Sequence, residues 1–266
     1  MGEETKNMIL SQLRREVLID SLNKNKRYDG RMLNEFRPIE LQFGPVTTAE
    51  GSALVALGNT KVLAAVKVTM ATPFPDRPKE GIFISNAELL PTASPMFETG
   101  PPGEECIELA RVVDRAVRSA ECIDLDSLYV EPEKVLAVFL DLYVLDHDGN
   151  YTDAATIAGV AALMDTKIPK VEDKKVIYGE YERELNPKAI PISTTFGKIG
   201  NYWLIDPSKE EELCFDTKLT IATTENHVCA IQKAEGKLNR KELMENIEIA
   251  FKTGKHIREL FKNLKG

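Results

Sequence analysis

The longest apolar run in the chain extends from Val135 to Leu145 and predicts a strand that is covered on both faces. The polar residues after it end the run, and the pair Gly149–Asn150 tolerates the left-handed backbone of a tight turn. Small and apolar residues then recur at steps of three and four from Ala154 to Leu163. This spacing predicts a helix that packs closely on its neighbours.

Hydrophobic periodicity also predicts the elements on either side of this unit. Amphipathic helices are expected over residues 3–24 and 104–121, and a last helix from Asn239 to Leu264, where Glu242 completes a capping box. Alternating or short apolar runs bounded by turn residues predict strands over residues 37–44, 51–57, 61–70, 82–90, 192–196, 202–205, 219–223 and 228–232.

This order of elements predicts an α/β (α+β) fold of mixed sheets with helices packed against them. We expect a single domain over residues 1–266, with an N-terminal helix and two similar halves that suggest an internal duplication. The N-terminal half covers about 25–168 and the C-terminal half about 190–266. Residues 169–189 are expected to be a charged, irregular connector with one short strand at 176–178.

Composition narrows the class of protein. Hydrophobic residues make up 43% and charged residues 29% of the 266 residues, as in globular proteins, and no apolar run is long enough to cross a bilayer. The N-terminus lacks the basic-then-apolar order of a secretory signal, and the four cysteines stand singly. We therefore expect a cytoplasmic protein without a membrane contact. A net charge of −8 argues against a globally basic nucleic-acid-binding surface.

One helix nevertheless carries a local stripe of basic side chains. Arg111, Arg115 and Arg118 follow one another at steps of four and three, so they share a helix face and are candidate contacts for RNA phosphates. In the alternative interpretation, Glu108 and Asp114 neutralise this stripe and it is only a solvated face.

The start of the helix after Gly149 is a candidate anion site, because free backbone N–H groups there attract phosphate. The residues in its first turn are Tyr151, Thr152 and Asp153, none of them basic. A carboxylate at Asp153 complements the helix dipole and repels a second anion. The sequence therefore predicts that the phosphate site is closed.

Taken together, several motifs resemble the ribonuclease PH superfamily over nearly the whole chain, and most closely the catalytically silent ribonuclease PH-like subunit of the archaeal exosome. The motifs are Arg27-Tyr28-Asp29-Gly30-Arg31 with Arg37-Pro38-Ile39, Gly51-Ser52-Ala53 leading to Leu57-Gly58-Asn59-Thr60-Lys61-Val62, the arginine-bearing helix from Glu104, Asp148-Gly149 before the alanine-rich helix, and Leu204-Ile205-Asp206-Pro207 with its acidic tail.

The resemblance implies a lost active site. Active members of the family place Gly-Gly-Thr-Arg-Thr after the central strand, where this chain has Gly149-Asn150-Tyr151-Thr152-Asp153 and so lacks the phosphate-binding arginine. The three acidic positions of the family correspond to Asp206, Glu212 and Lys218 here. A lysine among the ligands makes a poor site for a divalent cation. No catalytic residue, metal site or cofactor is therefore expected.

The resemblance further implies a non-catalytic component of the exosome, which degrades RNA from the 3′ end by phosphorolysis. Its expected partners are a homologous catalytic subunit, in a hexameric ring of three heterodimers, the RNA cap subunits of the exosome, and single-stranded RNA. Two alternatives remain at this point. The chain could itself be an active phosphate-dependent 3′-to-5′ exoribonuclease. It could also be a mononucleotide- or small-anion-binding α/β protein outside RNA metabolism that uses the turn at Asp148–Gly149.

Overall fold

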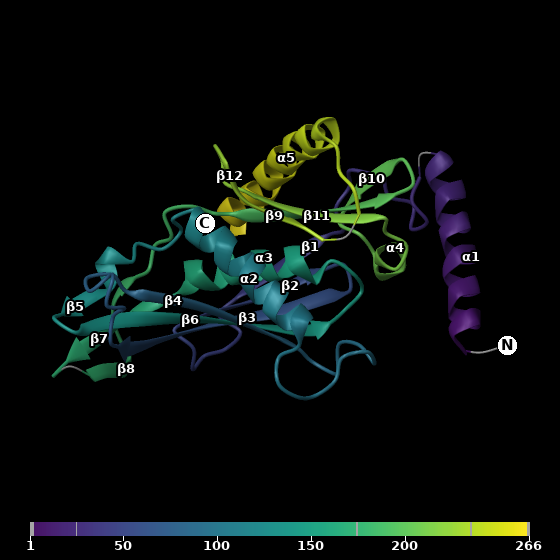
Figure 1. Ribbon diagram of the computed structural model, residues 1–266. Helices are drawn as coiled ribbons and strands as arrows, with labels where there is room; N and C mark the ends of the chain where they lie inside the picture. The colour runs from purple at the N-terminus through teal and green to yellow at the C-terminus, as the bar shows by residue number, and fades with distance from the viewer. Residues whose placement is uncertain (1–2, 25, 174, 235, 265–266) are drawn as a thin grey trace.

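The computed structural model describes residues 3–24, 26–173, 175–234 and 236–264 (Figure 1), with side chains from residue 13 to residue 261. The helices are α1 (Glu3–Asn23), α2 (Glu104–Ser119), α3 (Tyr151–Asp165), α4 (Lys209–Glu212) and α5 (Arg240–Leu264), with a 3-10 turn at Asp126–Leu128. The strands are β1 (Ile39–Phe43), β2 (Gly51–Leu57), β3 (Thr60–Ala71), β4 (Ile82–Leu89), β5 (Tyr129–Glu131), β6 (Lys134–Asp146), β7 (Lys167–Glu172), β8 (Lys175–Glu184), β9 (Ile192–Ile199), β10 (Tyr202–Ile205), β11 (Thr217–Thr223) and β12 (Val228–Lys233). The predicted mixture of sheets and helices is confirmed.

The described strands form two main sheets and a hairpin. The first sheet has the order β1-β2-β3-β6-β4, with β5 also paired to β6, and the second has the order β10-β9-β11-β12. β4 runs parallel to β6, whereas β2 and β3 form an antiparallel hairpin through Gly58, whose φ is +57°. Glycine is favoured at such an angle because it has no Cβ to clash with the backbone.

Helix α3 lies between the two main sheets and next to α2 (Figure 1). Every residue of α3 from Thr152 to Leu163 is buried, and α3 packs on β2, β3 and β9. Gly159 lies against the side chain of Leu140, where an added Cβ would approach to 3.1 Å. The small residues therefore let the helix approach both sheets. One hydrophobic core runs from β2 through α3 to Ile257 and Phe261 of α5.

Strand β6 differs from the prediction of burial on both faces. Its second half alternates, and Phe139, Asp141 and Tyr143 are partly exposed. The reason is that α2 and α3 pack on one face of this sheet, while the other face carries only a small cluster around Val135 and Ala137. Asp141 is compatible with this outer face because it accepts a hydrogen bond from Asn86 Nδ2 at 3.0 Å.

Residues 169–189 are not irregular as expected, because β7 and β8 form a two-stranded hairpin there, and the short strand predicted at 176–178 lies within β8. Side chains from Tyr178 onward in β8 are all exposed, so the strand lacks the alternation that marks a half-buried strand. Contacts between β7 and β8 hold it instead: Lys170 Nζ lies 3.7 Å from Glu180 Oε2, and Lys167 Nζ lies 5.8 Å from the Tyr181 ring centroid.

The predicted terminal helices are both present. At the start of α5, Asn239 and Glu242 form the predicted capping box, in which Glu242 N donates to Asn239 Oδ1 at 2.9 Å. Helix α1 lies at one side of the molecule (Figure 1), where Leu18 and Leu22 pack near β9 and β10 and Val17 is exposed. None of the helices described is both long and apolar enough to cross a membrane.

Candidate functional site

Two of the three predicted arginines share a groove between α2 and β12. Arg115 Nη2 donates to Gln232 Oε1 at 2.6 Å, and Gln232 Nε2 in turn donates to Glu108 Oε1 at 3.1 Å. Arg111 lines the same groove and is exposed, without an ion pair to any described residue. The neutralising contact expected between Glu108 and Arg111 is therefore absent from the described part of the chain, because Glu108 is bonded to Gln232.

Arg118 turns away from this groove. Its Nε donates to Asp114 at 2.8 and 2.9 Å, its Nη2 donates to the Phe83 carbonyl, and its guanidinium lies 5.4 Å from the Phe83 ring centroid. It lines a different cavity, together with Arg77 and Lys188. Spacing places all three arginines on one helix face, yet their guanidinium groups do not share one groove, because Asp114 and Phe83 of β4 hold the third group away from β12.

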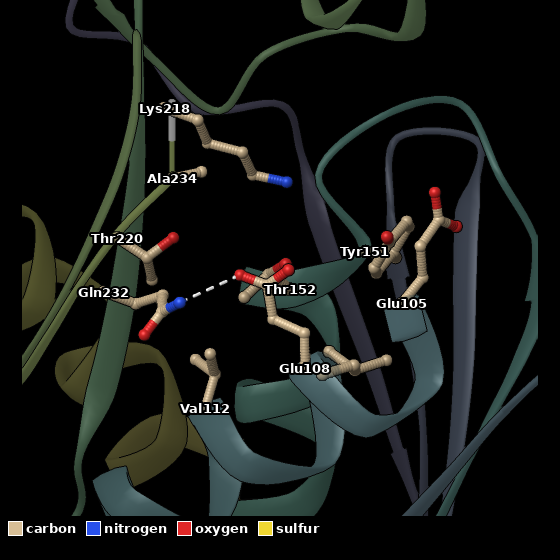
Figure 2. A pocket seen from close by; sticks show the side chains of 10 residues that line it. Glu105, Glu108, Val112, Tyr151, Thr152, Lys218, Thr220, Gln232 and Ala234 are labelled. Carbon is tan, nitrogen blue, oxygen red and sulfur yellow. Dashed lines mark hydrogen bonds between the residues drawn. The ribbon is translucent and has the colours of Figure 1, made fainter. Parts of the chain in front are cut away.

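The start of α3 lies beside this groove, at a small cavity lined by side chains of α2, α3, β11 and β12 (Figure 2). Its volume is about 30 Å³, enough for one or two waters. Figure 2 shows the Lys218 amine directed across the space toward Tyr151 and Thr152, with Glu105 and Glu108 on the far side. Lys218 Nζ lies 5.6 Å from the Tyr151 ring centroid. Two carboxylates therefore face the one lysine, and the cavity does not favour an anion.

Asn150 caps α3 and closes its N-terminus from within. The residue has φ +53°, and its Oδ1 accepts from the backbone N–H of Asp153 at 3.4 Å. The backbone N–H of Asn150 donates to Glu212 Oε1 at 3.1 Å. Two of the backbone donors that a phosphate could use at this helix start, those of Asn150 and Asp153, are thus occupied by side chains of the same chain.

Asp153 contributes to this closure differently from the prediction. Its fully buried carboxylate turns toward β9, where it accepts from Thr195 N at 2.8 Å and Thr195 Oγ1 at 2.7 Å, and it also accepts from Asn150 Nδ2. Burial raises the pKa of Asp153 to about 7, and these hydrogen bonds only partly oppose the shift. The site is closed by Asn150 and Glu212 rather than by repulsion from an exposed carboxylate.

Asp206 is the centre of a buried polar network. It accepts from Arg37 Nη2 at 2.7 Å and Arg37 Nε at 2.9 Å, from Arg31 Nη1 at 2.8 Å and from Asn150 Nδ2 at 2.8 Å. Burial alone would raise the pKa of Asp206, but the hydrogen bonds and charge of Arg37 outweigh it and hold the pKa below its ordinary value. The carboxylate is therefore ionised and fully occupied.

These contacts test whether the family's metal fits this chain. Both oxygens of Asp206 are taken by arginine and asparagine donors, and Lys218 Nζ lies 3.8 Å from Glu212 Oε1. Burial raises the pKa of Glu212, and the nearby Lys218 charge opposes the rise. A hard cation needs several free oxygen ligands. Across the described ranges, no three His, Cys, Asp or Glu side chains are grouped for a metal. The residues do not fit a divalent cation.

The sequence predicted the left-handed turn at Asn150, which is confirmed, but it predicted none of the side-chain contacts by which Arg37, Asn150 and Gln232 hold this region together. Arg37 lies in a motif that carried the family resemblance, so that motif was the available signal. Gln232 separates the groove from the small cavity, since its side chain lines both. No local pattern identifies Gln232, because its partners on α2 are more than 100 positions away in sequence: the separations are 117 and 124 residues.

Two sheets enclose a buried helix, and a network of buried charged side chains lies at the start of that helix; this fold defines the class of the protein. Residues 35–169 match the model described as "3' exoribonuclease family, domain 1", and residues 189–253 match "3' exoribonuclease family, domain 2". The chain belongs to the 3′ exoribonuclease family. The resemblance to the ribonuclease PH superfamily is thereby confirmed.

Curated relatives and solved structures agree with this assignment. The "Exosome complex component Rrp42" of Pyrococcus furiosus is 45% identical over 262 residues, which cover 96% of this chain and 95% of that protein. The protein of the same name from Methanopyrus kandleri is 44% identical over 260 residues, covering 96% of this chain and 97% of that protein. A chain of the "archaeoglobus fulgidus exosome with RNA bound to the active site" has a TM-score of 0.89 at 44% identity, covering 95% of this chain and 99% of that chain.

Proposed function

We propose that this chain is a non-catalytic subunit of an exosome, the RNA-degrading complex that works by 3′-to-5′ phosphorolysis. The observation that carries the proposal is the filled start of α3, where Asn150 and Glu212 occupy the helix N-terminus and the cavity holds no more than one or two waters. A chain that cannot place phosphate at this point lacks the nucleophile for phosphorolysis.

In the proposed complex the chain pairs with a homologous catalytic subunit in a ring of three heterodimers, which the RNA cap subunits cover. Its role is to support the partner's active site and to guide single-stranded RNA toward it. The high coverage of exosome components among its relatives supports this assembly. A cytoplasmic location is part of the same proposal.

For the RNA contact we propose Arg111 and Arg115 as the main residues, with Arg118 as the third predicted residue in a weaker role. Arg111 is exposed and has no ion pair within the described ranges, and Arg115 is held in the same groove by Gln232. Cations of this kind contact phosphate backbones without reading sequence. Arg118 has less free charge to offer because Asp114 already pairs with it.

The alternative is that the chain is itself an active phosphate-dependent exoribonuclease. Purified chain, alone and together with the catalytic partner, is incubated with RNA, phosphate and magnesium, and nucleoside diphosphates are measured. We expect diphosphates only when the partner is present. Release by the pure chain above the level of an empty-vector preparation would favour the alternative and contradict the proposal.

A further inference from the structure

A second group of basic side chains lies on the last part of α5. Lys252, Lys255 and Arg258 recur at steps of three, so they lie on one side of the helix. Together with Phe251, Glu225 and Glu259 they line a cavity of about 490 Å³. This volume lies within the range of about 300 to 1,000 Å³ that is usual for small-ligand sites.

Arg258 differs from an ordinary surface arginine because it is only 3% exposed. Its Nη1 donates to the carbonyl of Thr223 at 2.9 Å and to that of Ile190 at 3.4 Å. A guanidinium carries five N–H donors, and its Nε is buried without a hydrogen-bond partner among the described residues. Burial lowers the pKa of Arg258, and the charge of Glu225 only partly opposes this. Nη2 also makes no hydrogen bond to a described residue, so the guanidinium keeps donors that no described group uses.

The absence of a side chain at Gly254 leaves room for this guanidinium on the helix side. A Cβ on Gly254 would lie 2.8 Å from Thr223 Oγ1 and 3.0 and 3.1 Å from the two terminal nitrogens of Arg258. Thr223 Oγ1 is a second buried polar atom without a partner in the described part of the chain. Two side chains that each have a buried polar atom without a partner among the described residues thus lie beside Gly254, and such burial is costly.

The simplest structural explanation is that cations near the end of α5 complement the helix dipole. This accounts for the exposed side chains of Lys252 and Lys255. Complementing the dipole does not explain why the Arg258 guanidinium is buried, donates to backbone carbonyls and still has donors without a partner among the described residues. Planar guanidinium groups with free N–H donors are suited to bind phosphate oxygens, often by two parallel hydrogen bonds.

We infer that the cavity beside Arg258 binds a phosphate group. Arg258 is the fixed donor, and Lys252 and Lys255 attract the anion electrostatically. Glu225 and Glu259 line the same cavity and reduce the positive field, so the affinity is modest. The phosphate group belongs either to an RNA backbone or to free phosphate. This site is separate from α2 and from the start of α3, and the inference does not depend on the proposed function.

The test reverses the charge of the two exposed lysines, Lys252 and Lys255, and leaves the buried Arg258 in place, so that folding is not disturbed. Lys252→Glu/Lys255→Glu is compared with Arg240→Glu/Lys241→Glu, which makes the same charge change on exposed residues in the first turn of the same helix. Both are made in the full chain, within the assembly from which it purifies. Binding of inorganic phosphate is measured by isothermal titration calorimetry, with the number of sites counted per chain.

We expect one phosphate site per chain to weaken at least tenfold in the cavity variant and to remain in the control variant. Crystals soaked in tungstate, a phosphate analogue, should give an anomalous peak beside Arg258. An RNA oligonucleotide without terminal phosphates then separates the two sources. Loss of oligonucleotide affinity only in the cavity variant identifies backbone phosphate, whereas loss of inorganic phosphate binding alone identifies free phosphate.

Equal phosphate binding by the cavity variant and the wild-type chain, with no tungstate at Arg258, would overturn the inference. The phosphate titration contains no RNA and measures no degradation. Its failure therefore leaves the proposed exosome function untouched, and a failure of that function leaves this site untouched.

Discussion

Arg37 and Asp206 form a buried ion pair, in which Arg37 Nη2 lies 2.7 Å from Asp206 Oδ1. The pair joins the segment just before β1 to the residue that follows β10. Arg37 also donates to the carbonyls of Asp148 and Gly149 in the turn before α3. One side chain therefore holds together three segments that are distant in sequence. Asp206 has a structural role in this chain, whatever its role in active relatives.

We predict that Asp206→Asn lowers stability without removing catalysis from the assembly. The change leaves the buried guanidinium of Arg37 without its carboxylate, and breaking a buried pair in this way costs about 3–5 kcal/mol. The thermal midpoint of the purified assembly should fall. The matched control is Asp146→Asn, which removes an exposed pair with Lys61 at 3.7 Å and should cost at most about 1 kcal/mol.

Degradation by the same assembly is measured at a temperature where the Asp206→Asn variant remains folded. We expect a rate close to that of the wild type. A loss of about a hundredfold, the size associated with a missing general acid, would show that Asp206 takes part in the chemistry.

A second prediction concerns pH. The pKa of Asp153 is raised by burial from 3.8 to about 7, so between these values the folded chain holds a proton that the unfolded chain releases. The stabilisation of the folded state that protonated Asp153 contributes is fully present below about pH 4 and is lost as the pH rises through 7. The loss is at most about 4 kcal/mol, since one pKa unit is worth about 1.4 kcal/mol.

Asp153→Asn should remove this part of the pH dependence, because an amide can still accept from Thr195 N and donate to Thr195 Oγ1. Thermal midpoints are measured at pH 5 and pH 8. We expect the variant to gain stability relative to the wild type at the higher pH. Asp206 does not obscure the comparison, since its pKa is lowered and it titrates below this window. Parallel pH profiles for the two proteins would count against a protonated Asp153.

A third prediction separates the arginines of α2. Arg111→Glu/Arg115→Glu should weaken RNA binding by the assembly at least tenfold, because both side chains reach the groove beside β12. The dependence of log affinity on log salt should become shallower by about 0.7 for each phosphate that the variant no longer neutralises. Arg118→Gln should have a smaller effect, because Arg118 is paired with Asp114 and directed toward Phe83.

Binding is measured by fluorescence anisotropy across salt concentrations, after sedimentation has shown that each assembly is intact. If affinity and salt slope are unchanged by the Arg111/Arg115 reversal, the groove is a solvated face and the subunit serves only as a scaffold. A larger loss of affinity in Arg118→Gln than in the double variant would place the RNA on the other side of α2.

A fourth prediction concerns the chain without its partner. One face of the first sheet is covered by no helix among the described residues and carries apolar side chains such as Ile84 and Phe139, and β4 is an edge strand of that sheet. Exposed edges and apolar faces favour association. We expect aggregation or mixed oligomers when the chain is expressed alone, and burial of roughly 2,000 Å² or more with the partner. Sedimentation as a stable, monodisperse monomer would contradict this.

Most of the fold could be predicted from sequence because its elements have strong local signals. The apolar run of β6, the small residues of α3 and the capping box at Asn239 all mark structure within a few positions of themselves. The absence of an arginine at the start of α3 was also visible directly. The boundaries proposed for the two halves, about 25–168 and 190–266, stay a prediction.

The tertiary structure decided what local pattern cannot encode, namely the direction of side chains and their distant partners. Helical spacing placed Arg118 beside Arg115, yet Phe83 of β4 and Asp114 draw its guanidinium to the other side of α2. The sequence likewise determined that Asp153 follows the turn, while Thr195, 42 residues away, determines where its carboxylate points. The charge of a side chain and the hydrophobic period around it can be seen in the local sequence. The hydrogen-bond partners of a buried group, in contrast, come from segments that only folding brings together.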